Sequence, residues 1–176
     1  MDEIRYYLVN PVFTCGGIFM ISILALVVAL GTEFTLNLDP CELCIWQRWP
    51  YVITTALGMI GLVTLYREEW VQYASMVIFI AAAVFFANFL LAFYHVGVEY
   101  HWWTSALEGC AVEFKKGSLE ELVAMFDDKI PARCDDVKFR FLGISMAGYN
   151  MLLSLALAVA SGYSAVLVMR RDRGEI

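Results

Sequence analysis

Long stretches without a charged residue dominate the chain. Four of them cover residues 6–32, 49–66, 70–98 and 141–169, with histidine counted as neutral. A bilayer core about 30 Å thick needs about 20 apolar residues as helix, because backbone groups in lipid must bond within their own segment. We therefore expect four membrane-spanning helices, over about 8–30, 45–66, 70–94 and 143–169. The expected fold class is an all-α membrane protein, a four-transmembrane-helix bundle in one domain (1–176) with two outward loops, at about 31–44 and 95–142.

The composition supports a membrane protein. The chain has 61% hydrophobic and 17% charged residues, and its mean hydropathy is +0.67. These values exclude a soluble globular core, a nucleic-acid-binding protein and a disordered chain. The first charge-free run is longer than the core of a signal peptide, so we interpret it as a retained helix.

The basic residues predict the orientation of the spans. Short cytoplasmic connections carry an excess of Lys and Arg. With four spans both termini share one side, and that side collects Arg5, Arg67, Arg170, Arg171 and Arg173. We therefore expect cytoplasmic N- and C-termini and two outward loops; in a bacterial-type inner membrane the outward side would be the periplasm.

Four of the five cysteines fall in the outward loops, which is typical of disulfide chemistry in an oxidising compartment. The first pair is Cys41 and Cys44. Asp39 is a good N-cap residue and Pro40 suits the first helical position, so we expect the pair at the start of a helix that continues into the second span. Such a position lowers a thiol's pKa. Cys15, inside the first span, is assigned no role.

Arg48 strengthens this interpretation. It lies four residues after Cys44 and seven after Cys41, so the three side chains share one helical face. An arginine at the membrane boundary is costly without a counter-ion. Taken alone it fits an interface anchor, but beside a thiolate it predicts an activated dithiol.

The second pair is Cys110 and Cys134. It flanks a segment at 117–130 whose apolar residues recur at helical intervals, with Ser118 and Glu121 at capping-box spacing. We expect a short amphipathic helix there, either on the outer leaflet or packed against the loop. The pair itself is either a structural disulfide or a second exchangeable pair. Its polar neighbours, Arg133, Asp135 and Asp136, predict an exposed site that a partner protein could reach.

The cysteines also allow two other functions, and two tryptophans of the second outward loop allow two roles. One is a zinc site built from the four outward cysteines, with His95 or His101 as an additional ligand; the wide spacing of the second pair makes this the weaker interpretation. Another is a non-enzymatic tetraspan scaffold whose disulfides brace its loops. Trp102 and Trp103 fit interface anchors, with a docking groove as the alternative.

The motif Pro40-Cys41-Glu42-Leu43-Cys44-Ile45-Trp46-Gln47-Arg48 closely resembles the disulfide-bond formation protein B (DsbB) family of bacterial inner membranes. The four spans, and a late loop with two cysteines ahead of Phe141-Leu142-Gly143, match the same family. The resemblance implies a quinone-dependent protein-disulfide oxidoreductase. Its partners would be a DsbA-like periplasmic thiol oxidant, membrane lipid and ubiquinone or menaquinone, with no nucleic acid and no metal.

The resemblance also implies a role for each cysteine. Cys110 forms the mixed disulfide with the DsbA-like donor. The electrons pass to the Cys41 and Cys44 pair through a bond between Cys41 and Cys134. Cys44, as a thiolate, then contacts the quinone.

Two more site residues follow from the resemblance. Arg48 stabilises the charge beside the quinone. His95 is the best match for the family's histidine near the quinone, and His101 is a weaker one.

Overall fold

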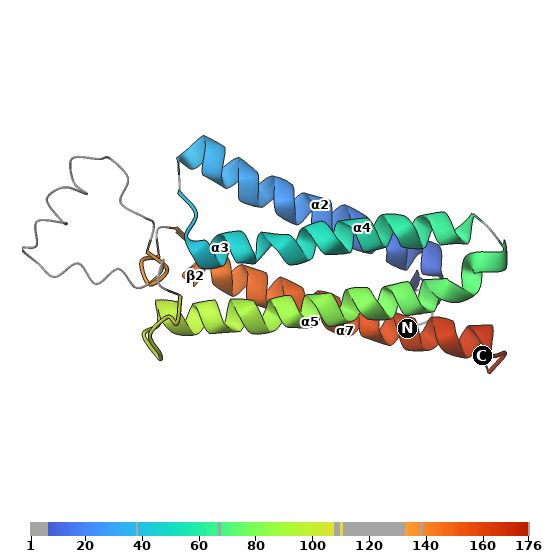
Figure 1. Cartoon of the computed structure of the whole chain (residues 1–176). Coiled ribbons are helices and arrows are strands. Elements are labelled where there is room, and N and C mark those ends of the chain that lie inside the picture. Colours follow the sequence, from blue (N-terminus) through green and yellow to red (C-terminus); the bar gives the residue numbers. More distant parts are fainter. Residues whose placement is uncertain are drawn as a thin grey trace, which may run out of the picture.

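The long helices lie side by side (Figure 1). The computed structural model describes residues 7–37, 39–66, 68–107, 110, 133–137 and 139–175. The long helices are α2 (Pro11–Leu36), α4 (Arg48–Leu65), α5 (Ala74–Glu99) and α7 (Met146–Asp172). Shorter elements connect them: α3 (Glu42–Trp46), the 3-10 helix η1 (Glu68–Tyr73) and the strands β1 (Arg140–Phe141) and β2 (Ile144–Ser145). Toward the α3 end, α2 tilts away from α4 (Figure 1).

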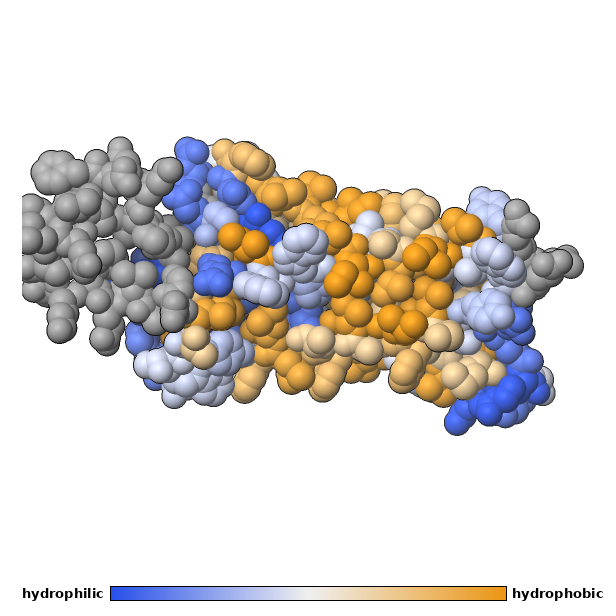
Figure 2. Space-filling model, viewed as in Figure 1, coloured by the Kyte–Doolittle hydropathy of each residue, from blue (hydrophilic) through white to orange (hydrophobic). Residues whose placement is uncertain are grey.

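Three of the described helices, α2, α5 and α7, are long and apolar enough to cross a membrane. Figure 2 shows the corresponding surface, a broad apolar band between two more hydrophilic ends. Large apolar side chains point outward on this band; Met20, Leu24 and Val159 are all more than 60% exposed. In water such a surface would be costly, whereas lipid solvates it. The prediction of a helical membrane protein is confirmed.

Local sequence determines where the long helices begin and end. Asn10 caps α2 by accepting a hydrogen bond from the Val12 N–H, and Pro11 occupies the first helical position. Ser145 caps α7 in the same way through the Gly148 N–H. Arg170 and Arg171 lie in the last turn of α7, where positive charge interacts favourably with the helix dipole.

Small residues let α2 and α4 pack closely. A Cβ added at Gly58 would lie 2.8 Å from the Phe19 backbone nitrogen and 3.0 Å from the Cys15 carbonyl oxygen. Close backbone approach through glycine is typical of helix pairs in membranes. Elsewhere, the central core joins all four long helices through apolar residues that include Ile18, Ile78, Phe85, Leu157 and Val168.

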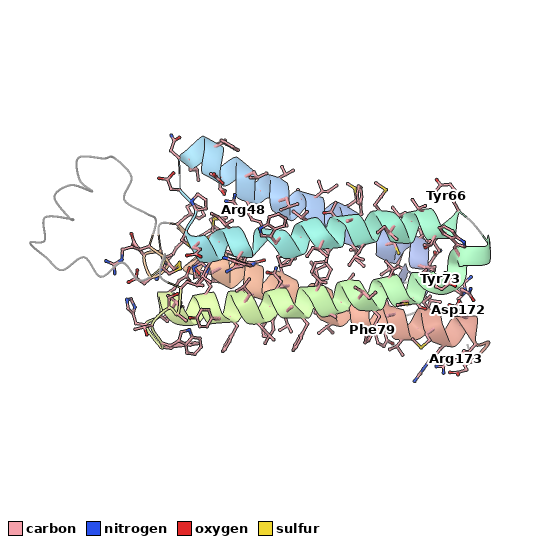
Figure 3. All side chains as sticks on the ribbon, in the orientation of Figure 1. Arg48, Tyr66, Tyr73, Phe79, Asp172 and Arg173 are labelled. Atoms are coloured by element: carbon pink, nitrogen blue, oxygen red, sulfur yellow. A yellow bond between two sulfur atoms is a disulfide. The ribbon has the colours of Figure 1, made fainter. Side chains whose placement is uncertain are left out.

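The two ends of the bundle differ chemically. The start of α2 and the end of α7 lie at one end, whereas α3 and β2 lie at the other (Figure 1). Figure 3 places Arg173, Tyr66 and Tyr73 at the first end and Arg48 toward the second. At the second end β1 and β2 pair antiparallel, and Leu142 and Gly143 make the turn with positive φ.

Two features near the cysteines differ from expectation. The first pair does not lie in a helix continuous with the second span, because α3 ends at Trp46 and α4 begins at Arg48. Pro50 explains the break, since it has no N–H for the Trp46 carbonyl and its ring crowds that carbonyl. In addition, α5 continues to Glu99, so His95 lies within a helix. The amphipathic helix expected at 117–130 lies outside the described residues.

Candidate functional site

Cys41 itself caps α3. Its backbone is extended, with φ −73° and ψ 168°, and its sulfur accepts a hydrogen bond of 3.4 Å from the Cys44 N–H. The prediction of an N-cap at Asp39 is therefore wrong by two residues. The capping hydrogen bond brings the two thiols together across the first turn, with their Sγ atoms 2.9 Å apart.

The two thiols have very different acidities. A hydrogen bond with Cys44 is the largest cause that lowers the pKa of Cys41 from an ordinary 9.0 to about 4; His95 lowers it further, and burial opposes both. The same hydrogen bond, followed by burial, raises the pKa of Cys44. Cys41 is therefore the more acidic sulfur of the reduced pair, and Cys44 keeps its proton.

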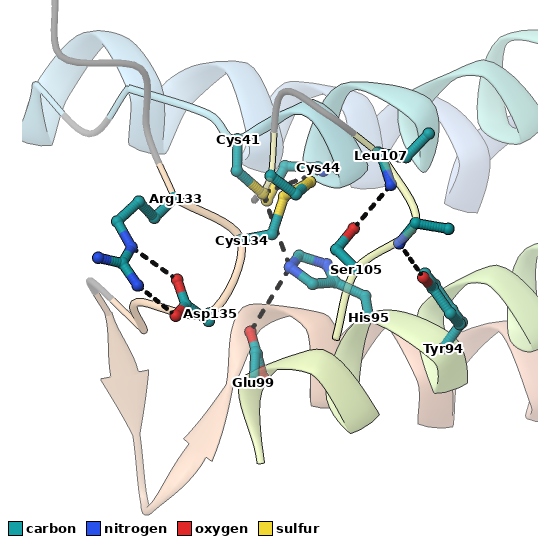
Figure 4. Close-up of a disulfide and its surroundings, with 12 residues drawn as sticks. Cys41, Cys44, Tyr94, His95, Glu99, Ser105, Leu107, Arg133, Cys134 and Asp135 are labelled. Carbon is teal, nitrogen blue, oxygen red and sulfur yellow. Dashed lines mark hydrogen bonds and ion pairs between the residues drawn. A yellow bond between two sulfur atoms is a disulfide. The ribbon is translucent and has the colours of Figure 1, made fainter. Parts of the chain in front are cut away.

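His95 lies directly against this pair (Figure 4). It belongs to the last two turns of α5 and is 2% exposed. Its Nε2 atom lies 3.6 Å from Cys41 Sγ and 3.9 Å from Glu99 Oε1, and its Nδ1 atom lies 2.8 Å from Gln47 Nε2. His101, by contrast, has a side chain that is 73% exposed, and it faces Asp135 at 3.8 Å.

The second pair, Cys110 and Cys134, forms a disulfide with a Cα–Cα distance of 5.0 Å. Both cysteines are buried, at 4% and 1% exposure, in one apolar cluster with Cys41, Leu43 and Val98. The expectation of an exposed pair is wrong. The polar neighbours do face solvent, where Arg133 and Asp135 pair at 2.7 Å, but Cys134 points inward beside Cys41 and Cys44 (Figure 4).

A cavity of about 410 Å³ opens beside the first pair. One side is apolar and comes mainly from α2, with Ile21, Leu24, Ala25 and Val28. The other side is polar and includes Cys41, Cys44, Gln47, Arg48, His95 and Glu99. Arg48 forms an ion pair with Glu33 of α2, Nη1 to Oε2, at 2.6 Å. The size and the mixed lining suit a small organic molecule with an apolar body and a polar head.

The site is a poor match for zinc. Cys41, Cys44 and His95 have ligand atoms within 4.8 Å of one another. Two thiolates on a tetrahedral zinc with Zn–S bonds of about 2.3 Å lie about 3.7 Å apart, which is wider than the observed Sγ–Sγ distance of 2.9 Å. The disulfide also leaves no thiolate at Cys110 or Cys134, so the expected four-cysteine alternative does not fit this arrangement.

Several residues around the site were missed by sequence reasoning. Glu33 and Glu99 each border a charge-free run, and Gln47 and Asn150 are amides at or within apolar helices. Polar residues in such positions usually pair with one another inside the bundle. That signal was present in the sequence, but their shared location at one end of the bundle required the fold.

The family model for Disulfide bond formation protein DsbB matches residues 12–164. The chain belongs to the DsbB family. It is 30% identical over 160 residues to "Uncharacterized protein RP370" of Rickettsia prowazekii (strain Madrid E), covering 90% of this chain and 87% of that protein. It is 27% identical over 171 residues to "Disulfide bond formation protein B" of Dechloromonas aromatica (strain RCB), covering 92% of this chain and 93% of that protein. The chain has no significant match among solved structures.

Membership of the DsbB family makes this chain a membrane thiol oxidoreductase. The geometry is consistent with that chemistry, because a closed disulfide and a reduced dithiol occupy one buried cluster.

Proposed function

We propose that this protein reoxidises a periplasmic DsbA-like dithiol and passes the electrons through its two cysteine pairs to a membrane quinone. The observation that carries the proposal is the placement of a dithiol, in contact with His95, between a disulfide and an apolar cavity. A donor in water and an acceptor in lipid need two different redox pairs, and the chain supplies both.

The first exchange would occur at the second pair. A thiolate of the donor attacks Cys110, the Cys110–Cys134 bond breaks, and Cys134 leaves as a thiolate. The donor's second thiol then attacks the mixed disulfide, which leaves the donor oxidised and Cys110 and Cys134 reduced. Because both cysteines are buried, this step requires the loop to present Cys110 to the donor.

The second exchange would move the electrons to the first pair. Cys134 attacks Cys41 of the Cys41–Cys44 disulfide and Cys44 leaves; Cys110 then attacks Cys134 and releases Cys41. The result is a closed Cys110–Cys134 bond and a reduced first pair, which are the bonds present in the structure.

The cavity residues fit a quinone. The apolar wall from α2 suits an isoprenoid-bearing ring, and Arg48, which lines the cavity together with Cys44, supplies a charged donor. When bound, a quinone would accept the two electrons and the one proton released as the first pair closes, and the second proton of the quinol would come from solvent. His95 would stabilise Cys41 as an anion, and Arg48 would bind a quinone oxygen.

Membrane placement completes the proposal. With 18 residues, α4 is about 27 Å long, close to the thickness of a bilayer core, so α4 is proposed as the fourth span. Arg170, Arg171 and Arg173 lie at the bundle end opposite the cysteines. This charge asymmetry supports cytoplasmic termini in a bacterial inner membrane, with the cysteine end in the periplasm.

The test mixes the purified protein in detergent with a reduced DsbA-like donor and a ubiquinone or menaquinone analogue, and follows quinone absorbance. Wild type and Cys15→Ser should turn over, because Cys15 is buried between α2 and α4 and away from both pairs. Cys44→Ser and Cys110→Ser should not. If wild type is inactive with both quinones while its disulfides persist in mild reductant, the chain is a disulfide-braced scaffold instead.

A further inference from the structure

A line of buried and half-buried polar side chains runs from His95 into the bundle. Asn150 Nδ2 donates to Gln47 Oε1 at 2.6 Å, and the Tyr51 hydroxyl donates to Asn150 Oδ1 at 2.6 Å. Ser154 and Asn88 extend the line, with Asn88 Nδ2 to Ser154 Oγ at 2.9 Å. The line joins α4, α5 and α7, and it ends at the Nδ1 atom of the histidine ring.

The direction of these hydrogen bonds determines what Gln47 offers the histidine. Because the Gln47 carbonyl oxygen accepts from Asn150, the amide nitrogen is the atom that faces His95 Nδ1. An amide NH₂ group only donates, so Nδ1 must accept with its lone pair. A neutral imidazole that accepts at Nδ1 carries its single proton on Nε2.

The groups on the other side of the ring require the same tautomer. Nε2 faces Cys41 Sγ and Glu99 Oε1; a thiolate is an acceptor, and so is Glu99 in its ionised form. A second bond fixes Glu99, since the Ser145 hydroxyl donates to its Oε2 atom at 2.5 Å. A proton on Nε2 is therefore favoured from both sides of the ring.

We propose that Gln47 and Asn150 are positioning residues that hold His95 as the Nε2–H tautomer, so that the ring donates to Cys41. The inference deepens the proposed function, on which it rests for its role in turnover. Neither residue touches a reacting sulfur; they act through the ring. Without them the ring can protonate Nδ1 instead and present a lone pair to Cys41, which removes a donor from the thiolate.

The first experiment reads the tautomer directly. The chain has two histidines, so a His101→Gln variant labelled with ¹⁵N-histidine reports only His95 in an NMR spectrum. In the reduced protein we expect Nε2 to give the signal of a protonated ring nitrogen and Nδ1 that of an unprotonated one. Gln47→Met and Asn150→Leu should mix or reverse these signals. Ser164→Ala, which removes another buried hydroxyl of α7 bonded to Thr14 and Leu8, should leave them unchanged.

The second experiment reads the thiolate. Gln47→Met should raise the midpoint of the Cys41 thiolate absorbance titration by about one pH unit, the size expected for losing a hydrogen bond to a charged group. In Gln47→Glu the carboxylate accepts a proton from Nδ1 and favours a doubly protonated ring, which still donates to Cys41 through Nε2. The midpoint of this variant should equal the wild-type value or lie below it. A wild-type Nδ1–H signal, or an unchanged titration in Gln47→Met, overturns the proposal. Neither experiment uses donor or quinone, so the result is independent of whether the relay turns over.

Discussion

We predict that reducing the Cys41–Cys44 disulfide takes up one proton across the neutral pH range, where an ordinary dithiol takes up two. The pKa of Cys41 is lowered to about 4, so this sulfur is ionised above that pH. The pKa of Cys44 is raised, so its proton stays in place. Reduction consumes protons, and the midpoint potential therefore falls as pH rises.

The magnitude follows from the two-electron relation of about 30 mV per tenfold change in the equilibrium constant. One proton gives a slope of about −30 mV per pH unit between pH 5 and 8, and two protons give about −59 mV. Below pH 4 Cys41 also takes up a proton, so the slope steepens there. Because pH 7 lies about three units above the pKa of Cys41, ionisation stabilises the reduced pair relative to a dithiol with ordinary pKa values. At about 30 mV per unit, the disulfide is more oxidising by about 90 mV.

The assay uses a Cys15→Ser, Cys110→Ser, Cys134→Ser variant, in which the first pair is the sole redox couple. The purified variant is equilibrated in glutathione buffers at several pH values, quenched with an alkylating reagent and quantified by mass. His95→Ala is the matched perturbation, because it removes one of the groups that lower the pKa of Cys41 and should move the break in slope to higher pH. A uniform slope of about −59 mV from pH 5 to 8 in the parent variant would refute the reasoning.

Two further predictions concern Arg48 and the packing of α2 against α4. Arg48→Ala should raise the KM for a quinone analogue by about 10- to 100-fold, the equivalent of a lost charged hydrogen bond, and it should leave Glu33 without its partner. The KM of Arg48→Lys should fall between those of wild type and Arg48→Ala. Unchanged steady-state kinetics in Arg48→Ala would contradict the assignment. Gly58→Ala should destabilise the protein by about 1–3 kcal/mol, because the new methyl group meets the backbone of Phe19. Gly16→Ala is the control, since its methyl group would have no atom within 4 Å to meet. Equal thermal unfolding midpoints in detergent for the two variants would contradict the packing argument.

The helices that cross the membrane were predictable because lipid imposes a simple rule. Every backbone group must bond internally, so a span appears as about 20 apolar residues in a row. The described helices α2, α5 and α7 satisfy this rule and are present. The break between α3 and α4 was also encoded, by Pro50, but the prediction gave more weight to the capping residues at 39 and 40.

The arrangement of the site was less predictable. The sequence places Arg133 and Asp135 beside Cys134, and their polarity suggested an exposed pair; both side chains do reach solvent, yet Cys134 between them is 1% exposed. Residues adjacent in a loop can face opposite directions, and no periodicity reveals which. The line from His95 through Gln47 to Asn150 was beyond sequence reasoning for a related reason, since it joins three helices whose relative rotation depends on packing.

The acidity of the first pair bears on which sulfur acts at each step of the proposed relay. In the reduced pair Cys41 holds the negative charge, and its presence keeps Cys44 protonated. When Cys41 is bonded to Cys134 it carries no charge, so the main cause that raises the pKa of Cys44 is gone. The anion can then reside on Cys44, which lines the same cavity as Arg48.

This transfer of charge can be tested in a trapped intermediate. In a Cys110→Ser variant, Cys134 can attack Cys41 of the oxidised first pair, and no thiol remains to resolve the mixed disulfide. We expect the pKa of Cys44 in that species to fall below its value in the reduced pair, because the hydrogen bond with the Cys41 anion is gone, and to rise again in a Cys110→Ser, Arg48→Met double variant. If Cys44 instead titrates in the trapped species as it does in the reduced pair, the Cys41 anion is not what raises its pKa, and the proposed transfer of charge to Cys44 is refuted.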